Sequence, residues 1–329
     1  MAASSVPLAQ TASASYAQIE QALALAQRSP HVADRVSAHF DELYLYGGPE
    51  HRARAMSTLT ALQRLYNESE QVGPLDLTRL DLHRALTALQ HGDVATASRA
   101  LDRSEQRCRK LDGELSWHLQ RLRAFIQINL GKVTEGRTQL FALHRRARCC
   151  ADSSNIGLFC VYDRHLPLST TQLGDVPHAL LAPDPHDPPN IWALKLRTLE
   201  QVGALDEARS ALELVPAERL GNLPCDREFL GCMGALARTA LRLQAHAYTR
   251  IIYERLSPYP ECFAVNLSGY CEGSVSLLLG MLARSIGDLD RALLHFEAAT
   301  IYSDQAEFAR SAAEARLEQS RCASVRAAQ

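Results

Sequence analysis

The chain has 329 residues, of which 47% are hydrophobic and only 6% aromatic, and its formal net charge is −2. A chain this close to neutral lacks the positive field of a general nucleic-acid-binding protein, and it contains no run of 18 apolar residues that could span a membrane. Its richness in Ala, Leu and Arg favours an all-helical fold over a sheet-based one.

The cysteines and the N-terminus both indicate a cytoplasmic protein. Nine cysteines, an odd number, are scattered through helical patterns, which is typical of reduced thiols and not of a disulfide framework. The first residues lack the basic start and apolar core of a signal peptide. We expect residues 1–14, which are small and polar, to be disordered.

Three helical patterns open the ordered part of the chain, at about 15–29, 32–46 and 50–70. Ser29-Pro30 and Gly47-Gly48-Pro49 separate them, because Pro and Gly interrupt helices. Tyrosines are frequent in these helices, which makes them a candidate surface for self-association into a homo-oligomer; they are Tyr16, Tyr44, Tyr46 and Tyr66.

A repeated turn pattern follows. Gly92, Gly131, Gly203 and Gly287 each precede a small residue by five positions and a larger apolar residue by nine, and Gln244 occupies the same place in a degenerate copy. The small residues are Ala97, Gly136, Ala208, Thr249 and Ala292, and the larger ones are Leu101, Leu140, Leu212, Tyr253 and Phe296. Spacings near 40 residues or twice that value indicate helical repeats.

The stretch 272–302 shows the repeat most clearly. If Gly287 is position 15 of a 34-residue unit, Leu279, Gly280, Ala292 and Phe296 occupy the signature positions of a tetratricopeptide repeat. The sequence therefore predicts an all-α, right-handed solenoid of about seven or eight helical hairpins, forming one domain over residues 15–325. The last pattern, at about 304–321, is predicted to be a capping helix.

The stretch 149–190 is the least regular part of the chain. It ends in a Pro-rich run and predicts either a shortened repeat or an inserted loop. Loops on such scaffolds often carry contacts, so this stretch is the place where a small-ligand receptor or an atypical enzyme could close a pocket over the groove.

Several motifs in the C-terminal half are more specific than the general repeat pattern. They are Trp192, LPCDREFL at 223–230, IIYERLSPY at 251–259, the run 269–299 and a final helix containing Arg310. Over about residues 185–320 they resemble the C-terminal helical-repeat region of large bacterial signalling ATPases. Ile252 and Tyr253 stand where that family has Leu-Tyr. In that family a nucleotide-binding module lies upstream, often with an adenylate or guanylate cyclase or a LuxR-type DNA-binding domain.

The catalytic parts of that family have no counterpart here. The sequence has no Gly-x4-Gly-Lys-Ser/Thr phosphate loop, no cyclase-type carboxylate pair and no helix-turn-helix with a basic recognition helix. The resemblance therefore implies only the sensing or protein-interaction portion. Cysteine and histidine spacing around Cys149-Cys150 is poor for zinc, so we predict no metal site. No Gly-x-Ser-x-Gly motif occurs, and we predict no catalytic residue and no cofactor.

A partner-binding groove is the remaining prediction. In tetratricopeptide arrays positions 2, 5, 9 and 12 of each first helix line the concave surface; we call these the inner-face positions. Arginine recurs there, and a row of guanidinium groups suits an extended or helical peptide that bears carboxylates. The candidate contact residues are Arg79, His118, Arg121, Phe125, Asn190, Arg197, Glu200, Arg238, Ser274, Met281 and Arg284.

Two alternatives stay open for this row. The arginines could instead pair with Asp or Glu of their own surface, and Trp192 is expected in the core. The function predicted from sequence is a non-enzymatic, cytoplasmic scaffold or regulator that binds a protein or peptide, which could be acidic, and neither nucleic acid nor membrane.

Overall fold

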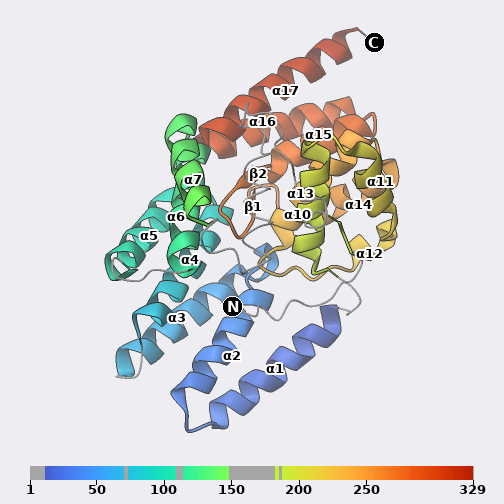
Figure 1. The fold of residues 1–329 in the computed structure, drawn as a ribbon. Coiled ribbons are helices and arrows are strands. Elements are labelled where there is room, and N and C mark those ends of the chain that lie inside the picture. The colour runs from blue at the N-terminus through green and yellow to red at the C-terminus, as the bar shows by residue number, and fades with distance from the viewer. Residues whose placement is uncertain (1–11, 70–72, 109–113, 148–181, 185–186, 329) are drawn as a thin grey trace.

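The computed structural model describes residues 12–69, 73–108, 114–147, 182–184 and 187–328 (Figure 1). Apart from one short strand pair and a 3-10 turn at Pro49–His51, its regular structure is α-helical. The N-terminal helices are α1 (Ala12–Arg28), α2 (Val32–Leu45), α3 (Arg52–Glu68), α4 (Pro74–Gln90), α5 (Val94–Cys108), α6 (Glu114–Asn129) and α7 (Val133–Ala147). The C-terminal helices are α10 (Pro189–Gln201), α11 (Leu205–Glu213), α12 (Ala217–Gly221), α13 (Phe229–Leu243), α14 (His246–Leu256), α15 (Val275–Ser285), α16 (Leu289–Gln305) and α17 (Ala309–Ala327).

The predicted all-α class is confirmed, with small differences at element ends. The breaks at Ser29-Pro30 and Gly47–Pro49 separate α1, α2 and α3 as expected. The predicted capping helix at 304–321 is instead α17 from Ala309, because Asp304 and Gln305 complete α16. The expected disorder of residues 1–14 falls almost wholly on residues 1–11, which lie outside the described residues.

The repeated turns fall where the sequence places them. Gly92, Gly131, Gly203 and Gly287 all have positive φ angles between 74° and 88°, and Gln244 adopts the same left-handed conformation with φ 54°. At each turn the following residue donates its N–H to the carbonyl five positions earlier, which closes the helix C-terminus. These turns join α4–α5, α6–α7, α10–α11, α13–α14 and α15–α16 into five helical hairpins.

Small residues let the two helices of a hairpin approach closely. A Cβ added to Gly280 would lie 2.5 Å from the Phe296 ring, and one added to Gly136 would lie 2.6 Å from the Ala124 carbonyl oxygen. The predicted partners Ala97, Ala208 and Ala292 are fully buried. The small-residue positions therefore act as packing notches, as the repeat pattern requires.

Between α14 and α15 lies a β-hairpin that was not predicted from the sequence. Its strands β1 (Phe263–Val265) and β2 (Cys271–Ser274) pair antiparallel, with Phe263 opposite Ser274 and Val265 opposite Cys271. We call residues 263–274 the central hairpin. In Figure 1 it lies between α4–α7 on one side and α10–α17 on the other.

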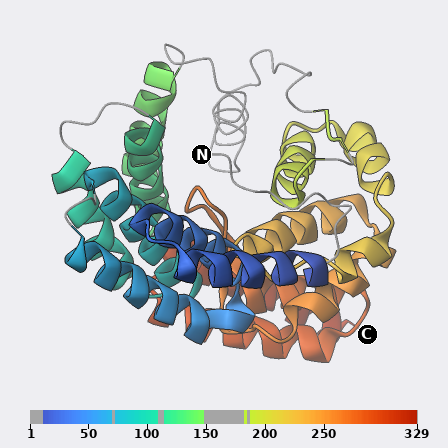
Figure 2. The same ribbon diagram turned by 90° about the horizontal axis from the view of Figure 1, so that it is seen from below.

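The central hairpin joins parts of the chain that are far apart in sequence. It packs on α13 and on α4, while α17 contacts α6. Viewed from below, the helices follow an arc with α7 and α10–α11 at opposite ends (Figure 2). In a simple solenoid each unit contacts only its neighbours, so these long-range contacts add to the predicted pattern and the solenoid itself stays a prediction.

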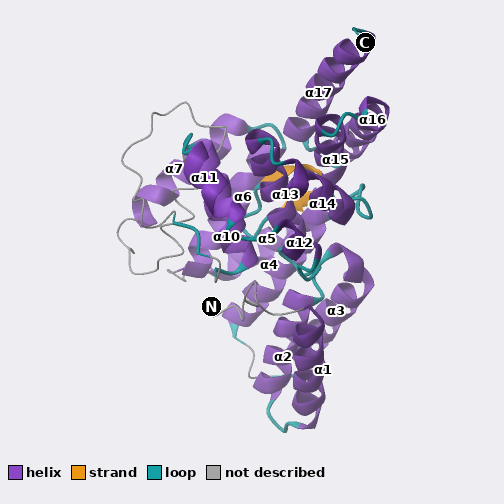
Figure 3. Ribbon diagram, turned by 90° about the vertical axis from the view of Figure 1, so that its right-hand side faces the viewer, coloured by secondary structure: helices purple, strands orange, loops and turns teal. Residues whose placement is uncertain are grey.

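The hydrophobic core is divided into several clusters. One cluster is built mainly from α10–α15 and includes the fully buried Trp192, as predicted, together with Phe125 from α6. A second joins α4, α5 and α6 to Phe263 of the central hairpin and Phe308 before α17. The helices α1–α3 extend away from the rest (Figure 3) and have two smaller clusters, one of which also includes Leu80 of α4. In the described part of the chain, no helix is both long and apolar enough for a membrane span.

Candidate functional site

The central hairpin covers much of the inner face where the partner was predicted to bind. Gly231 and Gly234, two inner-face positions of α13, would place a Cβ 2.7 Å from Asn266 Cα and 2.6 Å from Ala264 Cβ. The absence of side chains at these positions therefore lets the hairpin lie directly on α13. The segment that lies on these two positions of α13 belongs to the same chain.

An acidic residue of the hairpin meets the predicted arginine row. The Glu272 carboxylate is 0% exposed and lies 3.4 Å from Arg197 Nε and 3.2 Å from Arg238 Nε. Arg238 Nε also donates to the Glu272 carbonyl oxygen at 2.7 Å. The carboxylate that pairs with Arg197 and Arg238 comes from β2 of the same chain, whereas the prediction assigned these arginines to a partner peptide.

The network continues to neighbouring helices. Arg197 pairs with Glu200 on its own helix, and Arg238 pairs with Glu314 of α17 at 2.7 Å. Burial by itself would raise the pKa of Glu314, but Arg238 lowers it below its usual value. The alternative that these arginines pair with carboxylates of their own protein is thus what the structure contains.

The other side of the hairpin packs on α6. Phe125 makes an edge-to-face contact with Tyr270, with ring centroids 5.5 Å apart, and Asn129 Nδ2 donates to the Gly269 carbonyl oxygen at 3.1 Å. Arg121 is buried next to the rings of Trp117 and Phe125. These inner-face residues are therefore used for internal packing.

The remaining predicted contacts are dispersed. The Arg79 guanidinium stacks on the Phe40 ring at 4.2 Å, and Arg284 pairs with Glu318 of α17. Ser274 caps the N-terminus of α15 by accepting a hydrogen bond from Leu277 N. Half-buried His118 and Met281 lie beside Trp117 and a core cluster, respectively. Their assignment to partner binding stays a prediction.

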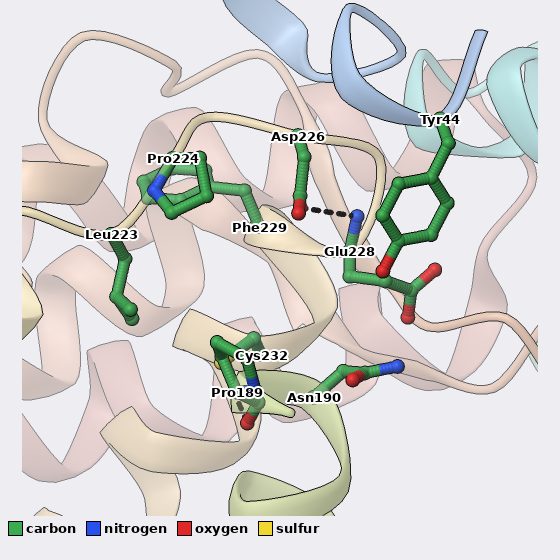
Figure 4. A pocket seen from close by; sticks show the side chains of 9 residues that line it. All are labelled: Tyr44, Pro189, Asn190, Leu223, Pro224, Asp226, Glu228, Phe229 and Cys232. Atoms are coloured by element: carbon green, nitrogen blue, oxygen red, sulfur yellow. Dashed lines mark hydrogen bonds between the residues drawn. The ribbon is translucent and has the colours of Figure 1, made fainter. Parts of the chain in front are cut away.

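The sequence LPCDREFL at 223–230 forms a second feature, a recess beside the N-terminus of α13 (Figure 4). The recess holds about 350 Å³ of empty space, including solvent at its mouth, and a neighbouring one of about 390 Å³ shares three of its lining residues, Asn190, Glu228 and Cys232. Figure 4 shows Tyr44 from α2 beside Glu228, so the first recess lies where the N-terminal helices meet α10 and α13.

Two carboxyl groups in this recess have unusual pKa values. Burial raises the pKa of Asp226 to about 7, although hydrogen bonds from the Glu228 and Phe229 backbone N–H groups oppose the change. Burial and the charge of Asp226 raise the pKa of Glu228 to about 8. Interactions with the Leu267 backbone and the Asn190 side chain oppose the rise in the Glu228 pKa. Asp226 Oδ1 accepts a hydrogen bond from the Glu228 backbone N–H at 2.9 Å, and Glu228 lies where α10, α13 and the central hairpin meet.

Arg227 ties the same segment to the N-terminal helices. Its backbone N–H donates to the Tyr44 carbonyl oxygen at 3.0 Å, and its carbonyl oxygen accepts from Gln90 Nε2 at 2.8 Å. Its Nη2 group donates to Thr87 Oγ1 at 3.2 Å. Burial lowers the pKa of the guanidinium to about 10. The motif 223–230 is thus a joint between α2, α4, α10 and α13.

The chemistry available at this joint is limited. Perturbed carboxyl pKa values mark candidate acid–base sites, but those of Asp226 and Glu228 follow from burial, which hydrogen bonding only partly offsets. Burial also raises the pKa of the Cys232 thiol, which keeps it protonated and a poor nucleophile. Within the ranges the structure describes, no group of three His, Cys, Asp or Glu side chains could hold a metal ion. The predicted irregular stretch 149–190 lies almost entirely outside the described residues.

No protein-family model matches the chain, and no curated protein is similar enough to count as a relative. The resemblance to the helical-repeat region of bacterial signalling ATPases therefore rests on the sequence motifs quoted above.

Sequence reasoning missed the central hairpin and the role of Asp226 and Glu228. One signal was present: Gly231 and Gly234 at two inner-face positions of one helix indicate a close approach by another backbone. The DRE triplet at 226–228 carried no comparable signal, because its burial depends on helices more than 130 residues earlier in the chain.

Proposed function

We propose that this protein is a non-enzymatic scaffold that binds another protein or a peptide, and that it acts in regulation. The observation that carries the proposal is the set of five helical hairpins, with left-handed turns and closely packed small residues, in the part of the chain that the structure describes. Stacked hairpins of this type present large, rigid surfaces, and their established use is recognition of other proteins.

The occupied inner face refines this proposal. The central hairpin already pairs with Arg197 and Arg238, so the partner binds to a different surface of the helical hairpins. The central hairpin itself holds the helical hairpins in a fixed arrangement. Arg197 and Arg238 are therefore structural residues, and charge reversal there would test folding before it tested binding.

Affinity purification tests the proposal. The full chain is immobilised, exposed to lysate of its source organism and cross-linked, and retained proteins are identified by mass spectrometry. We expect a partner that, once purified, binds the full chain saturably in solution. If no retained protein binds in solution, the scaffold proposal is wrong.

A small-ligand receptor is the second candidate, because two adjoining recesses share Glu228 and Asn190 and contain carboxyl groups with raised pKa values. A thermal-shift screen of metabolites distinguishes the candidates. A compound that stabilises the parent protein, and the Glu228→Gln variant much less, favours the receptor.

A further inference from the structure

A groove in the N-terminal helices has the chemistry of a docking site. Helix α2 packs against both α1 and α3, whereas α1 and α3 make little direct contact beyond the ion pair between Glu20 and Arg54. The space between them holds about 610 Å³, more than either recess at the joint. We call it the N-terminal groove; its lining residues are Leu23, Ala26, Gln27, Arg35, Ala38, His39, Ala61, Arg64, Leu65 and Glu68.

The floor of the groove is apolar. Leu23, Ala26 and Ala38 are buried there and form a small cluster of their own, and Ala61 and Leu65 of α3 complete it. Two short alanine side chains from different helices leave room for bulkier apolar groups to enter. Such a floor suits the apolar side of an amphipathic helix, which places side chains at i, i+3, i+4 and i+7.

The rim of the groove is predominantly cationic. Arg35 and Arg64 have no ion-pair partner among the described residues, and Glu68 is the one acidic residue in the lining. By contrast, Arg54 of α3 is paired with Glu20 and Glu42. The Nε–H group of Arg35 is also buried with no acceptor in the described part of the chain. A buried donor of this kind costs free energy until an acceptor arrives.

We infer that the N-terminal groove binds an acidic amphipathic helix of a partner protein. A fourth helix there would pack between α1 and α3 and complete a bundle, with apolar side chains on the alanine floor and carboxylates on Arg35 and Arg64. This inference rests on the proposed scaffold function and assigns it a surface and a partner chemistry.

A peptide experiment tests the inference directly. The probe is a fluorescein-labelled amphipathic peptide of about 18 residues, or about five helical turns, with Leu on one face and Glu beside it. The matched control peptide carries Lys in place of Glu. Binding to the full chain is measured by fluorescence anisotropy. We expect saturable binding of the Glu peptide, weakening as salt is raised, and at least about tenfold weaker binding of the Lys peptide.

Variants of the chain locate the site. The double variant Arg35→Glu/Arg64→Glu reverses the rim charge, and Ala61→Trp fills the floor; each should weaken binding of the Glu peptide at least about tenfold. Arg250→Glu, an exposed arginine of α14 far along the chain, is the control and should bind like the parent. Equal affinity for the two peptides, or unchanged binding by the double variant, would overturn the inference.

Two further outcomes separate this inference from its alternatives. If light scattering shows that the parent forms a dimer which the double variant does not form, the occupant is a second copy and the inference is wrong. If a partner found by affinity purification binds the double variant as tightly as the parent, the scaffold function stands and this groove assignment fails.

Discussion

Glu272 holds the inner face together because its buried carboxylate lies between two guanidinium groups from different helices. A carboxylate that is fully removed from water is stable only if it is paired and hydrogen-bonded, and removing it leaves the arginines partly unpaired. The structural importance of this residue therefore follows from its position on the central hairpin.

Replacing Glu272 by Gln should lower the free energy of unfolding by about 2–3 kcal/mol. Breaking a buried pair typically costs about 3–5 kcal/mol, and Glu200 and Glu314, which remain beside Arg197 and Arg238, reduce that cost. Denaturant unfolding measures the change, with exposed Glu297→Gln on α16 as the control. Equal stability of the two variants would show that the ion-pair network is not formed.

The carboxyl groups of Asp226 and Glu228 predict a specific pH dependence. Their folded pKa values, about 7 and about 8, lie above the ordinary values of 3.8 and 4.5. The folded state therefore holds protons that the unfolded state releases. This contribution to stability is fully present below the unfolded pKa values and is lost as the pH rises through the folded values.

We expect the parent's free energy of unfolding to fall between about pH 4 and 8, by up to about 1.4 kcal/mol per pH unit for each of the two groups. Glu228→Gln, which keeps a neutral acceptor for Asn190, should make the profile flatter, while exposed Glu207→Gln should leave the slope unchanged. Denaturant melts across this pH range provide the test. A parental stability that rises over the same range would contradict the assignment.

At the scale of elements, the helical hairpins depend on glycine in two different ways. Gly280 is required for space, because any Cβ there would meet the Phe296 ring, whereas turn glycines such as Gly287 are required for their positive φ angle. Gln244 takes the same left-handed conformation without being glycine, which costs roughly 1–2 kcal/mol.

Gly280→Ala should destabilise the protein by about 1–2 kcal/mol, because overpacking exceeds the gain in helix propensity. The matched control is Gly221→Ala in α12, where an added Cβ would meet nothing within 4 Å. Thermal unfolding of the two variants gives the comparison. A Gly280→Ala variant as stable as the control would mean that α15 and α16 do not pack this closely.

Gln244→Gly should instead stabilise the protein, by about 0.5–1 kcal/mol, since glycine adopts the left-handed conformation without steric cost. Gly287→Ala at the equivalent turn should have the opposite effect. If both substitutions destabilise the protein in denaturant melts, the two turns do not share one conformation.

The sequence predicted these turns and notches well because they are local: a turn, a small residue five positions later and a larger one beyond it lie within one helical hairpin. The central hairpin is different. Its strands are three and four residues long, and they are held by α4, α6 and α13 rather than by their own propensity. The ion pairs of Arg197 and Arg238 could not be predicted for the same reason, since Glu272 reaches them only through the tertiary fold.

At the scale of the whole molecule, the central hairpin occupies the positions on α13 that were predicted to contact a partner. It bridges α13 to α4 and α6, and Arg310 of α17 donates a hydrogen bond to its Cys271 carbonyl oxygen. Because the hairpin fills the inner face, the groove formed by α1–α3 becomes the surface on which recognition is proposed. Recognition at this groove, and not on α13, requires the central hairpin to be a permanent part of the core.

Hydrogen–deuterium exchange of the full chain tests this point most directly. If the hairpin is a fixed part of the core, the amides of residues 263–275 should exchange as slowly as those of α13, because buried, hydrogen-bonded amides open only with large-scale unfolding. If they exchange as quickly as the exposed C-terminal end of α17, the hairpin leaves the inner face readily and the account is contradicted.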